Sequence, residues 1–277
     1  MSEGEKKKFK FNWKEYAKTW GSYTPPAHPA ESDIRVIEVW VKKFIDENGK
    51  SPTVMILGVT PEFRDLFSQY NCPVTLVDIT PEMKMAMDTL LKESLNKAEV
   101  FVEVDWLLLD QKLEKNSFDL AIGDCVTNNI DYRNRDRFLE GIESVLKPGG
   151  YFISRNYLAL EKKMTLEEIL HQYDDQDEAN YTVMWCDFLF NLTWNEETRT
   201  IDNQKIAELT KDAGPQYAKL LENYFKAFPP FEKIWTMPSV EEQNEEYKRF
   251  FEIEKIVHND DYAYAEICPI YFLKKNP

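Results

Sequence analysis

The sequence has few glycines, a deficit of basic residues and no long apolar run. It contains nine glycines in 277 residues, and its 49 acidic residues exceed the 34 basic ones, which gives a formal net charge of −15. Nucleic-acid binding relies on lysine and arginine to displace counterions from phosphates, so this balance disfavours DNA or RNA as a partner. No segment approaches the about 20 apolar residues that a membrane-spanning helix needs, so we expect no membrane insertion.

Cysteine and histidine are also scarce and widely separated. The four cysteines show no spacing typical of a zinc knuckle or a redox motif, and the three histidines do not cluster. We therefore expect reduced thiols and no metal site. The amino terminus is charged and lacks the apolar segment of a signal peptide, which favours a cytoplasmic protein.

The sequence is nevertheless rich in residues that build a core. Hydrophobic residues make up 43% of the chain and aromatic residues 14%, which excludes a disordered protein. A chain of this length lies near the upper limit for one core, so a single domain with a large insertion is expected. We expect an aromatic cap over 1–31, a core over 32–156 and 237–277, and a helical insertion over 157–236 that acts as a lid for substrate.

Apolar runs alternate with helical patterns between residues 32 and 156. The spacing of Ile34, Ile37 and Val41 predicts a first helix over 32–47, with Ser32 or Asp33 as its N-cap. Further strands are predicted over 53–59, 74–79, 99–105, 117–124 and 151–156, and further helices over 61–70, 80–95 and 137–147. This alternation predicts a doubly wound, mostly parallel α/β sheet with helices on both faces.

After residue 156 the alternation stops. Residues 157–236 read as mostly helical, including 166–173 and 216–228, and are too long for a loop. A helix after Val240 then leads to two strands, over 251–260 and 265–275, whose close spacing predicts an antiparallel hairpin. The complete sheet would therefore have seven strands, the last of them antiparallel.

Polar residues follow the first four predicted strands, at the edge where open α/β sheets bind ligands. Gly58 lets the backbone approach a ligand, and Asp78, 20 residues later, is placed to accept hydrogen bonds from ribose hydroxyls. Asp105 and Trp106 suit an adenine ring, and Asp124 follows the fourth strand. Each could instead serve locally, as a turn, a helix N-cap or core filling.

Together these motifs resemble class I S-adenosylmethionine-dependent methyltransferases. The matching motifs are VMILGVT, LVDIT, VEVDW, FDLAIGDC and VLKPGGYFISRN, and the resemblance covers about residues 33–156 and 237–275. It implies a Rossmann-like fold in which the first turn lies under the methionine portion of S-adenosylmethionine and the next two acids hold its ribose and adenine. The implied cofactor-binding residues are Gly58, Val59, Thr60, Asp78, Ile79, Thr80, Met83, Asp105, Trp106, Asp124 and Cys125.

The first turn departs from the family pattern. The usual G-x-G-x-G turn is represented by Gly58 alone, with Thr60 and Glu62 at the positions of further glycines and Pro61 between them. A nicotinamide cofactor needs those glycines for its pyrophosphate, whereas S-adenosylmethionine has no phosphate, so nicotinamide is disfavoured. The departure leaves open a non-catalytic binding module that has lost the cofactor.

Methyl transfer is an in-line displacement that depends on positioning and on the exclusion of water. The candidate catalytic residues are Asp124, Asn128 and His171, and the candidate substrate contacts are Trp20, Tyr23, Asn129, Tyr157 and Trp185. Aromatic walls suit a small organic acceptor, planar or cationic. A protein substrate docked on exposed aromatics of the insertion is the alternative, and a homodimer stays open.

Overall fold

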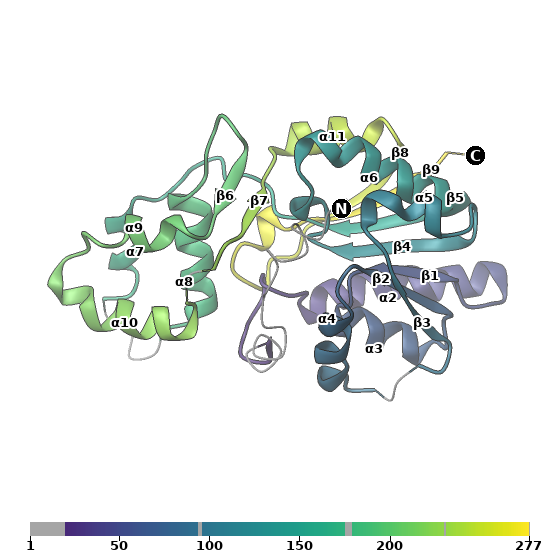
Figure 1. Ribbon diagram of the computed structural model, residues 1–277, viewed down its shortest axis with the longest axis horizontal. Coiled ribbons are helices and arrows are strands. Elements are labelled where there is room, and N and C mark those ends of the chain that lie inside the picture. The colour runs from purple at the N-terminus through teal and green to yellow at the C-terminus, as the bar shows by residue number, and fades with distance from the viewer. Residues whose placement is uncertain (1–19, 94–95, 175–178, 230, 277) are drawn as a thin grey trace, which may run out of the picture.

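The computed structural model describes residues 20–93, 96–174, 179–229 and 231–276, and its centre is a seven-stranded sheet (Figure 1). The strand order is β3-β2-β1-β4-β5-β9-β8. The strands are β1 (Val54–Leu57), β2 (Val74–Asp78), β3 (Glu99–Glu103), β4 (Phe118–Asp124), β5 (Leu146–Arg155), β8 (Phe251–Val257) and β9 (Ile270–Lys275). Strands β1 to β5 pair in parallel, and β9 runs antiparallel to both of its neighbours. The predicted fold class is confirmed.

Helices cover both faces of this sheet (Figure 1). One face carries α2 (Glu31–Asn48), α3 (Pro61–Gln69) and α4 (Pro81–Met87), and the other carries α5 (Leu109–Lys112), α6 (Tyr132–Val145) and α11 (Val240–Lys248). Strand β1 shows why the layers form. Its Val54 and Ile56 belong to the core under α2 and α3, whereas Met55 and Leu57 belong to the core under α6. Because neighbouring side chains of a strand point to opposite faces, a strand buried on both sides has to be apolar throughout.

Several predicted boundaries are wrong. The first helix begins at Glu31 rather than Ser32, and Asp33 lies inside it, where it accepts a hydrogen bond from the Ala30 amide at 2.9 Å. Helix α4 ends at Met87 instead of reaching residue 95, helix α6 begins five residues before the predicted 137, and β5 begins at Leu146, so that Pro148, Gly149 and Gly150 lie inside the strand. The first residues of β5 continue directly from α6 and pair with β4 across a register shift, which turn residues alone do not reveal.

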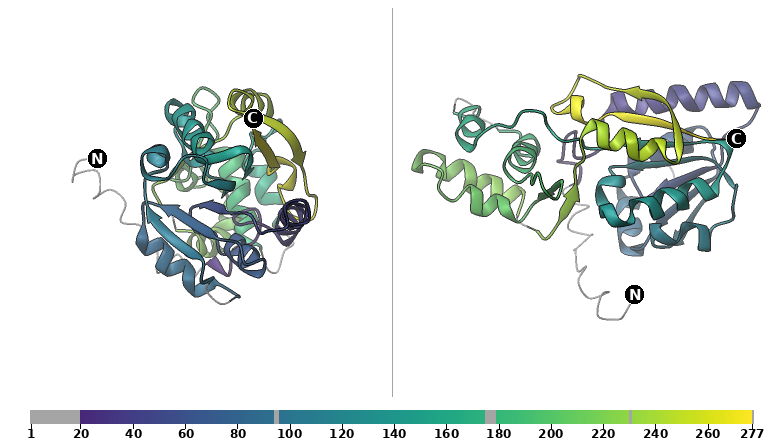
Figure 2. Two further views of the ribbon diagram at one scale, coloured as in Figure 1. Left: turned by 90° about the vertical axis from the view of Figure 1, so that its right-hand side faces the viewer. Right: turned by 90° about the horizontal axis from the view of Figure 1, so that it is seen from above.

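The segment between β5 and α11 forms a separate body beyond the carboxyl end of β5 (Figure 2). It contains α7 (Leu166–His171), α8 (Tyr181–Asp187) with a π-helical extension (Phe188–Leu192), α9 (Lys205–Leu209) and α10 (Ala218–Ala227). It also contains an antiparallel ribbon of β6 (Thr200–Asp202) and β7 (Ile234–Thr236), which the sequence did not predict. These helices share their own apolar cluster, built around residues such as Met184, Phe188 and Phe190.

The chain before α2 lies between the two bodies. Tyr23 stacks on Phe228 of the insertion, and the Thr24 amide donates to Thr182 on α8. On the other side the Pro26 carbonyl accepts from Arg155 at the end of β5. The predicted aromatic cap therefore has a described part, residues 20–30, that contacts both bodies, while Trp13 and Tyr16 lie outside the described residues.

Candidate active site

The ends of β1, β2 and β3 meet at Gly58. Its backbone has a φ of +85°, a left-handed conformation that glycine adopts without steric cost. The Val77 carbonyl accepts hydrogen bonds from the Gly58 amide at 2.9 Å and from Trp106 Nε1 at 2.7 Å. A Cβ atom on Gly58 would lie 3.8 Å from the Trp106 ring and 4.0 Å from Asp78 Oδ2. Three residues expected near one cofactor are thus within contact distance of one another.

Asp78 is oriented by its own neighbourhood. The carboxylate accepts a hydrogen bond from the Thr80 amide at 2.8 Å, just before α4 begins at Pro81. Burial raises the pKa of Asp78, and the hydrogen bonds from Thr80 and Ile79 oppose this rise. Ile79 beside it is 49% exposed, so an apolar side chain faces outward next to a buried acid. This pairing offers a hydrogen-bond acceptor and an apolar surface at one place.

Asp105 and Trp106 take local roles as well. Asp105 caps the short helix Trp106–Leu108 by accepting from the Leu107 amide at 2.9 Å, and Trp106 is half-buried against Phe138. Asp105 is therefore a helix N-cap and Trp106 packs against the core, as the local alternatives predicted. Both residues are only half-buried, so they are still partly exposed at the edge of the sheet where the strands end.

Glu62 is a site residue that the sequence reasoning noted only as a missing glycine. It is the second residue of α3, and its Oε1 accepts from Trp20 Nε1 at 3.4 Å and lies 3.4 Å from His28 Nδ1. Burial raises the pKa of Glu62, and His28 opposes the rise. The signal that could have identified it is a second copy of its Thr-Pro-Glu motif, at residues 80–82.

Asp124 forms a buried ion pair with Arg155, which lies one strand away at the end of β5. Arg155 Nη1 contacts Asp124 Oδ1 at 2.5 Å, and Arg155 Nε lies 3.1 Å from Asp33 Oδ2, without hydrogen-bond geometry. Arg155 Nη2 donates to the Pro26 carbonyl at 2.7 Å. Although burial disfavours its charge, Asp124 raises the pKa of Arg155 well above the usual value. Arg155 lies within the VLKPGGYFISRN motif, but the sequence assigned it no role because its partners Asp33 and Pro26 are remote in the chain.

Three cysteines that are remote in sequence share the apolar cluster of the insertion. Cys125, Cys186 and Cys268 are buried and free. Burial raises the pKa of each thiol well above its usual value, so all three are protonated and weakly nucleophilic at neutral pH. Cys125 has a positive φ of 51° and its amide donates to the Arg155 carbonyl, which makes it part of the turn after β4.

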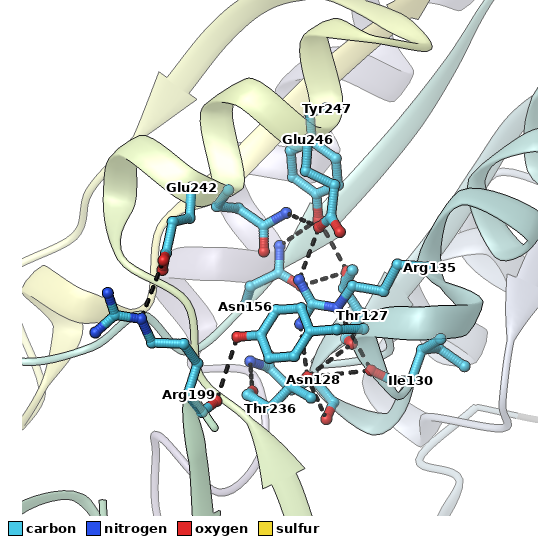
Figure 3. Close-up of polar contacts among 12 residues, drawn as sticks. Thr127, Asn128, Ile130, Arg135, Asn156, Arg199, Thr236, Glu242, Glu246 and Tyr247 are labelled. Atoms are coloured by element: carbon cyan, nitrogen blue, oxygen red, sulfur yellow. Dashed lines mark hydrogen bonds and ion pairs between the residues drawn. The ribbon is translucent and has the colours of Figure 1, made fainter. Parts of the chain in front are cut away.

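Asn128 joins the core to both connections of the insertion, and Figure 3 shows its contact with Thr236 at one of them. Its Nδ2 donates to the Tyr157 carbonyl at 2.8 Å and to the Thr236 carbonyl at 2.7 Å, and its Oδ1 accepts from the Tyr157 amide. The side chain is 1% exposed. Because both donors are used within the protein, Asn128 positions the two chain segments, and we do not retain it as a catalytic candidate.

Thr236, where β7 ends, is held by a second set of contacts (Figure 3). Arg135 Nη2 donates to Thr236 Oγ1 at 2.6 Å, and Arg135 Nη1 pairs with Glu246 of α11 at 2.7 Å. Arg199 pairs with Glu242 of the same helix. These contacts fix how the insertion returns to the sheet.

Aromatic side chains line the insertion where it faces the amino-terminal segment. Tyr23 stacks on Phe228 with ring centroids 5.0 Å apart, and Phe228 stacks on Trp185 at 5.7 Å. Trp185 Nε1 donates to Asn203, and the Tyr157 hydroxyl donates to the Pro26 carbonyl. The predicted substrate residues Trp20, Tyr23, Tyr157 and Trp185 therefore belong to one connected wall, whereas Asn129 is exposed and donates to the Cys125 carbonyl.

His171 does not belong to this region. It lies on α7, in the insertion, where its ring is exposed and pairs with Asp174 (Figure 1). It is no longer a catalytic candidate. Within the described ranges no cluster of histidine, cysteine and acidic residues has the geometry of a metal site, and no helix there has the length and apolarity to cross a bilayer.

Comparison with known families agrees with the fold. The sequence pattern of a family described as "Methyltransferase domain" matches residues 62–253, more than half of the chain. The chain belongs to this family of class I, S-adenosylmethionine-dependent methyltransferases. No curated protein sequence is a significant match.

Solved structures show the same fold at low sequence identity. The PH0226 protein of Pyrococcus horikoshii has a TM-score of 0.55 and 17% identity, over 95% of this chain and 99% of that one. An S-adenosylmethionine-dependent methyltransferase of Methanosarcina mazei has a TM-score of 0.52 and 16% identity, and the match covers 81% of this chain and 92% of that one. The 1,6-didemethyltoxoflavin-N1-methyltransferase of Burkholderia thailandensis, solved with 1,6-didemethyltoxoflavin and S-adenosylhomocysteine bound, has a TM-score of 0.50 and 11% identity, over 88% and 78%.

Proposed function

We propose that this methyltransferase transfers the methyl group of S-adenosylmethionine to a small organic molecule in the cytoplasm. The observation that carries the cofactor assignment is the convergence of Gly58, Asp78 and Trp106 at the ends of three neighbouring strands. Asp78 would hold the ribose hydroxyls, with Ile79 beneath the adenine ring and Asp105 near its amino group. When bound, the cofactor supplies an electrophilic methyl group on a sulfonium.

The acceptor would bind between the sheet edge and the aromatic wall. The cofactor, held by Asp78 and the turn at Gly58, would supply its methyl group to the acceptor's nucleophilic atom and leave as a neutral thioether, and a proton bound to that atom would pass to solvent. Asp124 is paired with Arg155, Asn128 is enclosed and His171 is remote, so we assign no general base. The residues would accelerate the reaction by orienting both partners and excluding water.

The burial of the insertion's aromatics favours a small acceptor over a protein. In the described part of residues 157–236, every aromatic side chain of phenylalanine, tyrosine and tryptophan is buried or half-buried. A docking surface for a protein would expose a contiguous apolar patch instead. The Burkholderia thailandensis enzyme binds the small molecule 1,6-didemethyltoxoflavin, which also supports a small acceptor for this chain.

Calorimetric titration with S-adenosylmethionine, S-adenosylhomocysteine and NAD tests the cofactor assignment, with Asp78→Ala as the site variant. We expect micromolar binding of both sulfur nucleosides, a loss of about a hundredfold or more in the variant because two hydrogen bonds to a charged acceptor disappear, and no binding of NAD. Folded wild-type protein that binds neither sulfur nucleoside would favour the non-catalytic binding module instead.

A further inference from the structure

Among the residues that the structure describes, the second oxygen of the Glu62 carboxylate has no partner. Glu62 Oε1 contacts Trp20 and His28, whereas Oε2 is buried and accepts no hydrogen bond from any described residue. A buried polar atom without a partner destabilises the fold, and more so when its group is charged. A cationic donor at Oε2 would remove this cost and would favour the ionised acid that burial disfavours.

A second helix of the same chain shows that helix capping does not explain this burial. Helices α3 and α4 both open with Thr-Pro-Glu, which places Glu62 and Glu82 at the same second position. Either carboxylate can interact favourably with the positive end of its helix. Glu82 is exposed to solvent, whereas Glu62 is turned toward residues 20–28 and carries the unpaired oxygen.

The position of Glu62 identifies what cation could reach it. It lies four residues after Gly58, beyond the end of β1. It is also close enough to Asp124 of β4 for the negative charge of that acid to raise the pKa of Glu62. With adenosine at the ends of β2 and β3, the amino-acid portion of the cofactor would extend past β1 toward β4. Formal charges of −3 on Asp33, Glu62 and Asp124 face +1 on Arg155, and a protonated His28 would still leave an excess of −1, so the region favours a cation.

We propose that Glu62 Oε2 accepts a hydrogen bond from the ammonium group of the cofactor's methionine portion. The inference rests on the proposed use of S-adenosylmethionine. It gives the departure at the first turn a function, because a charged side chain stands where the usual pattern has a glycine. A charge-assisted hydrogen bond is about twice as strong as a neutral one.

A set of variants and ligands tests this contact by calorimetry. Wild type, Glu62→Gln and Glu82→Gln are titrated with S-adenosylhomocysteine and with 5′-methylthioadenosine, which keeps the adenosine and the thioether but lacks the amino acid. We expect Glu62→Gln to weaken S-adenosylhomocysteine about tenfold or more and to leave methylthioadenosine within about twofold. Glu82→Gln, the matched change on α4, should alter neither affinity.

The outcomes separate this inference from the cofactor assignment. Wild type that binds neither ligand would overturn both. Wild type that binds, combined with equal losses for both ligands in Glu62→Gln or no loss for either, would overturn only the role of Glu62. Should Glu62→Gln not fold, wild type is titrated with the S-adenosylhomocysteine analogue in which hydrogen replaces the amino group. A loss of about tenfold supports the contact, and an unchanged affinity refutes it.

Discussion

The two halves of the sheet edge hold their polar residues in different ways. In the nucleoside half, which comprises Gly58, Asp78, Asp105 and Trp106, the acids are oriented by amides two residues further along the chain, at Thr80 and Leu107. These contacts form within one turn of backbone. The local backbone therefore sets the orientation of both carboxylates.

In the junction half, which comprises Asp124, Asn128 and Arg155, the partners are remote. Arg155 binds a carbonyl 129 residues away, at Pro26, and Asn128 binds one 108 residues away, at Thr236. Polar groups here tie the amino-terminal segment and the insertion to the sheet. The first half is the part to which we assign the cofactor in our proposal, whereas the contacts of the second half set where the insertion lies relative to the sheet.

Removing the central cation of the junction half should have the largest effect. Arg155→Met leaves the buried carboxylates of Asp33 and Asp124 without their cationic partner, which costs about 3–5 kcal/mol of unfolding free energy. Arg137→Met, which breaks a partly exposed pair with Asp110, should cost about 0–1 kcal/mol. Urea denaturation of both variants measures the difference. Similar losses would mean that the Arg155 cluster does not hold the junction.

The same contrast explains what the sequence could predict. The central strands were found because strands buried on both faces are continuous apolar runs, whereas β3 lies at the edge of the sheet and is only partly buried. Gly58, Asp78 and Asp105 were found because each follows a predicted strand. The orienting contacts of the two acids are local, so sequence position placed them, whereas the Gly58 amide donates to Val77, 19 residues away. The family match and the seven-stranded sheet confirm the class of fold that these motifs indicated.

The insertion and the junction could not be predicted in this way. The ribbon of β6 and β7 joins residues about 200 and 235, and the paired segments are too short to give a periodic pattern. Arg155 sits in an ordinary strand sequence, and its role depends on Asp33 and Pro26, which only the folded chain brings near. Asn128 and His171 were reasonable catalytic residue types, but their partners in the fold decide their roles.

A change at the first turn should separate backbone strain from binding. Gly58 and Gly149 both have positive φ, +85° and +75°, so alanine at either position should cost about 1–2 kcal/mol of stability. Gly149 has nothing within 4 Å of an added Cβ and lies in the first half of β5, away from the carboxyl ends of the strands. Gly58 instead faces Asp78 and Trp106. We expect both variants to lose stability in urea, and only Gly58→Ala to lose about tenfold in affinity for S-adenosylhomocysteine. Equal affinity losses would show that the strain acts through the whole fold.

The smallest expected effect is a pH dependence confined to the nucleoside half. Burial raises the pKa of Asp78 above 3.8, so its carboxylate begins to protonate at a higher pH than an ordinary aspartate. The ribose requires the charged acceptor, and the affinity should therefore fall as the pH is lowered. Methylthioadenosine, which does not reach Glu62, should therefore bind more weakly at pH 5 than at pH 7.

Asp78→Asn is the control for this titration, since an amide cannot titrate in that range. Its affinity for methylthioadenosine should be lower than that of the wild type and the same at both pH values. An unchanged wild-type affinity at pH 5 would mean that the hydrogen bonds from Thr80 and Ile79 outweigh burial and keep Asp78 ionised. A slope that persists in Asp78→Asn would instead assign the titration to another acid of the sheet edge and would overturn the role of Asp78 in the pH dependence.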